Sequence, residues 1–384
     1  MPQGRARLTH LRSRPGEGWR SQVAGWLFCL PAIVLLVMFL VIPIALAAWV
    51  SLSNWQGIGS PLASGVHSDG LANYKAQLVR PGLAQQFLGE SLRNNLYFVL
   101  LVVPIQTFLA LVFAIIISRK GLFARGFFRT AYYFPSVASS VAIAILFQFL
   151  FSGSGTVNTV LGFIGVHGPS WFTDPSGIIQ DLLGVLGVRN GPGVLVHHGL
   201  LGNSWWQWLA GPSVAMCVLI FLAIWTTTGT LMIIFLPALY NISAEVEEAA
   251  KVDGASAWTQ FWKITVPLIR PVMFLVITLG IIGTWQVFDS VALISQGMPQ
   301  GTTLTPAYLA YTTSFSDQQF GQGAAISFLL FALIIVIVLL QRWWLRSRET
   351  RVERRERREQ RAVVVQPARL VEGQAAGVRS ESAR

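Results

Sequence analysis

The chain has 384 residues, of which 53% are hydrophobic and only 12% are charged. So few charges cannot cover a chain of this length with a soluble surface, which excludes an ordinary soluble globular protein and indicates a membrane protein. The net charge of +11 does not predict nucleic acid as a partner, because no stacking aromatics interleave the Arg-rich run near the C-terminus.

Apolar runs long enough to cross a hydrocarbon layer of about 30 Å as helices recur along the chain. There are six of them, at residues 24–52, 95–117, 132–151, 213–236, 272–294 and 324–340. Backbone groups in lipid must satisfy their own hydrogen bonds, and the runs show no strand-type alternation. The sequence therefore predicts an all-α membrane protein with six transmembrane helices. The first run is too long for an ordinary cleaved signal peptide, so we expect an uncleaved span.

Basic residues gather before the first span, in alternate connections and after the sixth span. By the positive-inside rule, this alternation places both termini in the cytoplasm. We expect residues 1–23 to form a basic cytoplasmic segment and residues 24–341 to form the transmembrane domain. Residues 342–384 are expected to form an Arg-rich cytoplasmic tail, partly disordered and attracted to anionic membrane lipid.

A long external segment is predicted at residues 153–212, between the third and fourth spans. It is rich in glycine and carries four tryptophans, Trp171, Trp205, Trp206 and Trp208. Indole rings favour the membrane interface, and stacking on carbohydrate is their alternative use here. His197 and His198 are adjacent and lack a neighbouring carboxylate, so no metal site is expected from them.

The stretch EEAAKVDGASAWTQFWKITVPLIRP, residues 247–271, is unusually polar for a connection between two spans. Ser243 can cap a first helix, and Gly254 can end it in the left-handed conformation that glycine adopts most cheaply. A second amphipathic piece follows with aromatic residues on one side. The loop at residues 241–271 is thus predicted to be a helix-turn-helix elbow outside the bilayer. It could be an interfacial hairpin, or a knob that docks in the groove of a soluble partner.

This stretch resembles the cytoplasmic EAA loop of binding-protein-dependent ABC importer permeases. In that family the loop is a coupling helix that sits in a cleft of the cytoplasmic ATPase. The resemblance implies the same ATPase-coupling role for six residues here. These are Glu248, Ala249, Ala250, Asp253, Gly254 and Ala255.

The resemblance covers residues 25–343 and includes the motifs GLANYKAQL, WQVFD and FGQGAAISFLL. They are similar to sugar-type permeases such as the membrane components of maltose and glycerol-phosphate importers. The resemblance implies a second six-span permease, two ATPase subunits and an extracytoplasmic solute-binding protein, all at a prokaryotic plasma membrane. Residues 177–212 are longer than usual for the family, and the Arg-rich tail is an addition.

The sequence contains no GxxxxGK[ST] loop for phosphate and no convergent set of catalytic groups. We therefore expect a transport subunit that is not an enzyme, with no cofactor of its own. ATP and Mg²⁺ are expected at the partner ATPase subunits.

Polar residues within spans usually face a bundle interior or an aqueous path. The predicted substrate path comprises Trp285, Gln286, Asp289 and Gln148. Trp285 could stack on a sugar while Gln286 and Asp289 bond its hydroxyls; the alternative is interhelical bonding by Gln286 and headgroup-level solvation of Asp289.

Buried cations are scarce, which disfavours a strongly anionic solute. The expected function is an importer permease for a sugar or related polyol. The alternatives are a sugar-phosphate importer permease, or a channel or scaffold whose elbow is only an interfacial hairpin.

Overall fold

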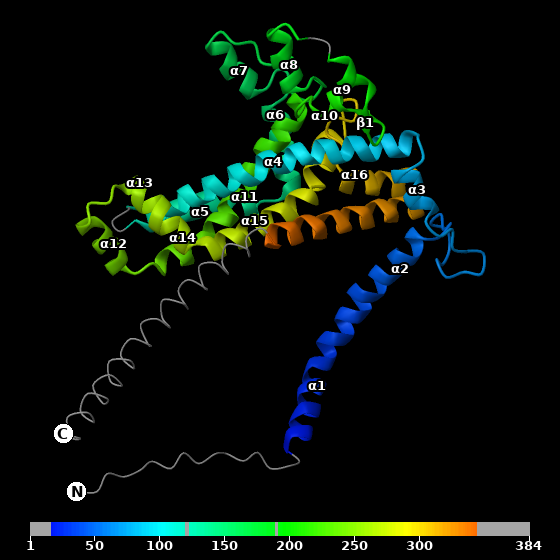
Figure 1. Ribbon diagram of the computed structural model, residues 1–384, viewed down its shortest axis with the longest axis horizontal. Coiled ribbons are helices and arrows are strands. Elements are labelled where there is room, and N and C mark those ends of the chain that lie inside the picture. The colour runs from blue at the N-terminus through cyan, green and yellow to red at the C-terminus, as the bar shows by residue number, and fades with distance from the viewer. Residues whose placement is uncertain (1–16, 120–122, 189–190, 344–384) are drawn as a thin grey trace, which may run out of the picture.

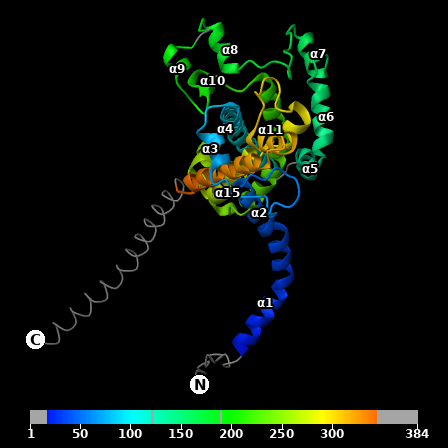
Figure 2. The same cartoon turned by 90° about the vertical axis from the view of Figure 1, so that its right-hand side faces the viewer.

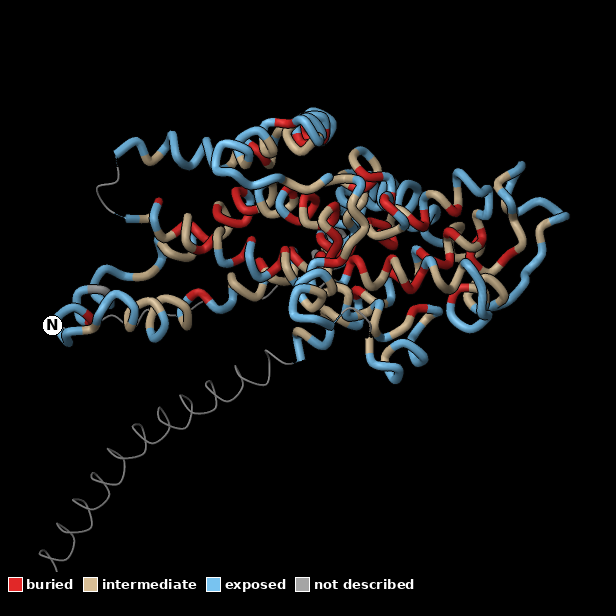
Figure 3. The backbone as a smooth tube through the Cα atoms, turned by 90° about the horizontal axis from the view of Figure 1, so that it is seen from above, coloured by how far each residue is buried: buried red, intermediate tan, exposed pale blue. Residues whose placement is uncertain are grey.

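The computed structural model describes residues 17–119, 123–188 and 191–343. Most of this part is helical, and its centre is an elongated bundle (Figure 1). The bundle is built on α4 (Leu83–Ser118), which packs against α11 (Val214–Tyr240) and α15 (Arg270–Trp285). The last helix, Phe320–Trp343, lies along the same bundle. Buried residues are concentrated in the bundle interior (Figure 3).

Four helices are long and apolar enough to cross a membrane by themselves. These are Gln22–Ser51, α4, α11 and Phe320–Trp343. Two further pairs meet the same test only as bent segments, so the number of spans is four, or six if each bent pair counts as one. One pair joins α5 (Arg125–Val137) to α6 (Ser140–Leu150) at 93°, and the other joins Ala257–Leu268 to α15 at 74°.

The bend between α5 and α6 and the end of α15 correct the sequence prediction at the third and fifth spans. Residues 132–151 are not one straight helix, since α5 ends at Val137 and α6 starts at Ser140. The predicted fifth span at 272–294 ends early, because α15 stops at Trp285 and a π-helical turn, η3 (Val291–Ser295), follows the break. Broken helices are tolerated at membrane depth where protein covers them or where they line a cavity.

The N-terminal helix leaves the bundle at an angle (Figures 1 and 2). It consists of α1 (Glu17–Leu36), the π-helical turn η1 (Val37–Val41) and α2 (Ile42–Ser51). None of its most apolar stretch is buried within the described structure. Its attachment lies at its end, where the Ser51 hydroxyl is 2.9 Å from the Tyr74 hydroxyl of α3 (Ala72–Leu78). Such an apolar surface requires lipid or another protein around it.

Short elements occupy the long segment at residues 153–212 and rise from one side of the bundle (Figure 2). They are α7 (Thr156–Phe163), α8 (Ile178–Val185), α9 (Gly193–His197), β1 (Gly199–Leu200), β2 (Asn203–Ser204) and α10 (Trp205–Trp208). β1 and β2 form an antiparallel pair in which Gly199 lies opposite Ser204. The expectation of an all-α chain is therefore corrected by one small hairpin.

The two ends of the bundle carry different structures (Figure 1). At one end lies the elbow, which contains α12 (Ala244–Val252), α13 (Ala257–Gln260), η2 (Phe261–Thr265) and α14 (Val266–Leu268). At the opposite end lie α3, α16 (Pro306–Tyr311) and the π-helical turn η4 (Thr312–Ser316).

Close helix contact in the bundle depends on Gly229 of α11. A Cβ atom at Gly229 would lie 2.1 Å from the backbone oxygen of Tyr132, so α5 crosses α11 with no room for a side chain. Small residues of this kind let helix backbones approach closely in membranes.

Candidate functional site

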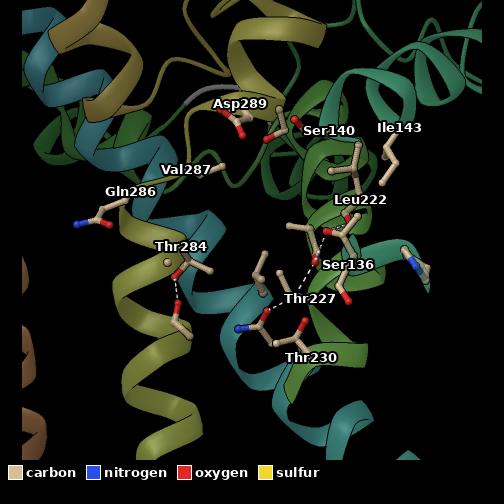
Figure 4. A pocket seen from close by; sticks show the side chains of 18 of the residues that line it. Ser136, Ser140, Ile143, Leu222, Thr227, Thr230, Thr284, Gln286, Val287 and Asp289 are labelled. Carbon is tan, nitrogen blue, oxygen red and sulfur yellow. Dashed lines mark hydrogen bonds between the residues drawn. The ribbon is translucent and has the colours of Figure 1, made fainter. Parts of the chain in front are cut away.

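A cavity of about 600 Å³ lies inside the bundle. Its walls come from α4, from both sides of the α5–α6 bend, from α11, and from α15 with the residues that follow it (Figure 4). The polar side chains around it include Gln106, Ser136, Ser140, Thr226, Thr227, Thr230, Thr284, Gln286, Asp289 and Ser290. The cavity therefore combines an apolar wall with many neutral hydrogen-bonding groups.

The end of α15 shapes one wall of this cavity. α15 stops at Trp285, and the residues of the break, Gln286 to Asp289, all line the cavity. A helix end leaves backbone carbonyls without partners, which is costly inside a protein. Here Asn95 donates from Nδ2 to the Trp285 carbonyl at 3.3 Å, and the Thr305 hydroxyl donates to the Val287 carbonyl at 3.1 Å. Both donors are fully buried, so they hold the broken helix in place.

Sequence reasoning did not identify Asn95 or Thr305. The available signal was weak, because a polar residue near the end of an apolar run is common at a membrane boundary. Only the fold brings these two residues to the break. Asn95 is 190 residues from Trp285 along the chain, and Thr305 is 18 residues from Val287.

The hydroxyl groups of α11 form a second polar wall. The Thr227 hydroxyl lies 2.5 Å from Oε1 of Gln106 on α4 and 2.7 Å from the Ala223 carbonyl. The Thr226 hydroxyl donates to the Leu222 carbonyl at 2.9 Å. A hydroxyl that donates to its own helix keeps lone pairs that accept hydrogen bonds. These threonines can thus accept hydrogen bonds from the hydroxyls of a polyhydroxylated solute without leaving a donor unpaired.

The charge around the cavity is limited to one carboxylate. Asp289 is exposed, and no Lys or Arg is among the described residues that line the cavity. A phosphate or carboxylate solute would find no cation on these walls, whereas charge-assisted pairing is the usual means of holding one. The geometry therefore suits a neutral, polar solute.

The structure separates the four residues predicted for the substrate path. Gln286 and Asp289 line the cavity, but Trp285 and Gln148 do not. Trp285 is 4% exposed and packs with Val99, Val103, Leu330 and Ile334, so its ring is not placed to stack on a solute. Gln148 donates to the Leu293 and Ile294 carbonyls at 3.1 and 3.2 Å, which ties α6 to η3.

The elbow has a well-defined helix end. Gly254 has φ of +73°, its N–H donates to the Lys251 carbonyl at 3.1 Å, and the Ala255 N–H donates to the Ala250 carbonyl at 2.9 Å. These are the two hydrogen bonds of a Schellman motif, with glycine in the left-handed position. The expected helix stop at Gly254 is confirmed. The expected side-chain cap is not, since the Ser243 side chain makes no capping bond to α12.

The elbow presents most of its predicted coupling residues to the surface. Glu248, Ala249, Asp253 and Gly254 are exposed, Ala255 is half-buried, and Ala250 is buried. The elbow is anchored by Phe261, which packs against a buried group that we call the elbow-side core. This core comprises Ala110, Leu111, Ala114, Ile117, Leu231, Met232, Phe235, Leu236, Ile269 and Val276.

The elbow-side core extends to the cavity. Leu231 belongs to this core and also lines the cavity.

Among the residues that the structure describes, no cluster of three or more His, Cys, Asp and Glu side chains is arranged to hold a metal ion.

Comparison with known proteins gives consistent relatives. The lactose transport system permease protein of Rhizobium radiobacter is 31% identical over 85% of this chain and 95% of its own length. The multiple sugar-binding transport system permease protein of Streptococcus mutans is 27% identical over 83% of this chain and 93% of its own.

A solved structure has a similar fold. It is a bacterial alginate ABC transporter in complex with a periplasmic protein bound to an alginate pentasaccharide. One of its chains superposes with a TM-score of 0.62 at 20% identity, covering 86% of this chain and 96% of that one. Residues 96–350 match the family described as the inner membrane component of binding-protein-dependent transport systems, and the protein belongs to that family.

Proposed function

We propose that this protein is one permease half of an ATP-driven importer, and that its cavity carries a neutral sugar or a related polyol. The observation that carries the proposal is the cavity lining, which offers hydroxyl and amide groups and a single carboxylate. A sugar that leaves water must replace many hydrogen bonds at once, and such a wall supplies them. Relatives named for lactose and for multiple sugars support the same class of solute.

A sugar phosphate fits this half of the path less well. Its charge would meet the Asp289 carboxylate and no Lys or Arg among the described lining residues, so no ion pair would compensate for the lost hydration. Membership of the transport family argues against the alternative of a channel or scaffold.

The proposed assembly contains partners that supply energy and solute. The chain has no GxxxxGK[ST] sequence, so ATP and Mg²⁺ would bind to two separate ATPase subunits. A second six-span permease would complete the path, and an extracytoplasmic binding protein would deliver the solute. Both termini and the elbow would lie in the cytoplasm, which puts α16 on the external side.

The elbow is proposed to pass motion from the ATPase to the cavity. Residues Glu248 to Ala255 would sit in a cleft of the ATPase, where the small side chains of Ala249 and Gly254 permit close approach. Movement of the elbow would act on Phe261, which contacts the elbow-side core, and this core reaches the cavity at Leu231. A packed core transmits such a shift because it resists compression.

Uptake measurements test the proposal. Membrane vesicles that contain the complete transporter and its binding protein are loaded with ATP and offered labelled lactose, glucose or glucose 6-phosphate. The expected result is ATP-dependent uptake of a neutral sugar that glucose 6-phosphate does not compete away. Uptake without ATP, or a preference for the phosphorylated sugar, would contradict it.

Co-purification tests the partners. The tagged chain, mildly solubilised, is expected to retain a second permease and an ATPase, and the Gly254→Pro variant is expected to lose the ATPase. Recovery of the chain alone under several detergents would refute the proposed assembly.

A further inference from the structure

A continuous row of aromatic rings starts at the cavity and leads to the end of the bundle opposite the elbow. Phe288 lines the cavity, and its ring centroid lies 5.3 Å from that of Tyr311 in α16. The Tyr311 ring lies 5.1 Å from Phe315 in η4. Phe315 is 5.5 Å from Phe320, which is in turn 5.1 Å from Trp55.

The rings in this row differ in exposure. Tyr311 is 45% exposed and Phe315 is 63% exposed, while Phe288 is half-buried at the cavity. We call these three residues the aromatic track. Phe320 and Trp55 continue the row beyond the track, and Gly57 leaves the space that the Phe320 ring fills, since a Cβ there would lie 2.1 Å from that ring. The track is therefore a fixed surface with two accessible rings.

A role as a membrane-interface belt does not explain the track well. Belts of aromatic residues usually stand beside Lys and Arg side chains that reach the headgroups. The charged residues of the segment 286–341 are Asp289 and Asp317, and Lys75 of α3 lies at the same end of the bundle. What separates the track from a belt is its continuation to the cavity wall at Phe288.

Hydroxyl groups also lie on and beside the track. Tyr311 has one, and Tyr308, whose ring stacks on Tyr311 with centroids 6.3 Å apart, has another. Burial, with a further contribution from Tyr311, raises the pKa of Tyr308.

We propose that the aromatic track binds successive rings of a neutral oligosaccharide as they pass between the external mouth and the cavity. This inference rests on the proposed function, and it adds that the solute has several sugar rings. The apolar face of a sugar ring packs on an aromatic face while its hydroxyls stay in water. The centroids of adjacent rings in the track are 5.3 and 5.1 Å apart, so neighbouring rings are in contact, and the track reaches the cavity wall at Phe288.

The test compares saccharides of different length. Vesicles with the complete transporter and binding protein take up labelled glucose, arabinose, lactose, maltopentaose or arabinopentaose. The variants are Tyr311→Ala and Phe315→Ala, with Phe315→Trp as a conservative replacement. Phe163→Ala is the matched control, because Phe163 is an 85% exposed phenylalanine in α7 outside the track. Assembly is checked by co-purification of the partner permease.

The expected result is a length-dependent loss. Phe315→Ala and Tyr311→Ala should raise the half-saturating concentration of a transported pentasaccharide about three- to ten-fold. The value for a transported shorter sugar should change less than two-fold, and Phe315→Trp and Phe163→Ala should resemble the wild type.

Other outcomes overturn the inference in distinguishable ways. A wild-type transporter that takes up short sugars but no pentasaccharide would refute the track and leave the proposed function intact. The same holds if assembled variants show no effect, or the same effect on every length. Failure to take up any of these saccharides would refute both the aromatic track and the proposed function.

Discussion

The elbow and the cavity are built in opposite ways. The elbow is local, since its helix, its Schellman end and its anchor Phe261 come from one short stretch of chain. The cavity is assembled from segments between Phe98 and Ile294, and its wall depends on a hydrogen bond between Asn95 and Trp285. Under the proposed function, the site for the ATPase lies in one contiguous motif, whereas the path for the solute needs the whole bundle.

The strongest way to break this comparison is to damage the elbow and leave the cavity untouched. Glu248→Lys reverses an exposed charge that no described residue pairs, so the fold should survive. If Glu248 faces the ATPase, losing a charged contact at an interface costs about 2 kcal/mol or more, which corresponds to about a thirty-fold loss of ATP-driven uptake. Uptake and ATP hydrolysis are measured on the same vesicles.

Asp317→Lys is the control for this variant, because it reverses an exposed acid that directly follows η4, at the other end of the bundle. It should leave the coupling of hydrolysis to uptake unchanged. Normal uptake in Glu248→Lys would show that the elbow does not couple.

A second variant should damage the cavity and leave the elbow intact. Asn95→Leu removes the donor to the Trp285 carbonyl, and a buried carbonyl without a partner costs about 1–3 kcal/mol. The free energy of unfolding of the purified transporter should fall by that amount, and uptake should fall with it, while the ATPase still co-purifies. Asn241→Leu, at an exposed site after α11, should do neither. Equal effects of the two variants would mean that Asn95 does not hold the break.

The smallest expected effect sharpens the comparison within one helix. Thr227→Val removes the hydroxyl that contacts Gln106 at the cavity. Thr228→Val removes a hydroxyl that bonds only the Ile224 carbonyl and does not line the cavity. One hydrogen bond is worth about 0.5–1.5 kcal/mol, so Thr227→Val should raise the half-saturating sugar concentration about five-fold. Thr228→Val should leave it nearly unchanged, and a reversed order would argue against the assigned wall.

The sequence was most informative where structure is local. The glycine stop at Gly254 follows from a residue type and a helical pattern, and both are visible in the chain. The long apolar helices follow from composition, so α11 and Phe320–Trp343 appear close to their predicted positions, whereas α4 starts at Leu83, twelve residues before the predicted span.

The rest depends on tertiary contacts that no local pattern contains. Hydropathy treats residues 272–294 as one run, although the helix ends at Trp285, where Asn95 and Thr305 compensate the break. The same reasoning placed Trp285 in the path from its residue type, but the direction of a side chain around a helix decides whether it meets solute or core. The 93° bend between α5 and α6 does have a local signal, since Pro135 lies two residues before the end of α5 and Ser139 and Ser140 form the joint, and proline and serine pairs are common at sharp bends; a search for apolar runs does not use that signal.

The helix breaks around the cavity have an electrostatic consequence. α5 and α15 end beside the cavity, and their C-cap residues Ala138 and Gln286 line it; α6 begins there with Ser140. Helix ends carry partial charges of about half a unit, negative where carbonyls are left over and positive where N–H groups are. A hydroxyl both donates and accepts, so a sugar meets complementary dipoles whichever way it turns. Such a lining holds the solute weakly in many orientations, which suits a path that has to release what it binds.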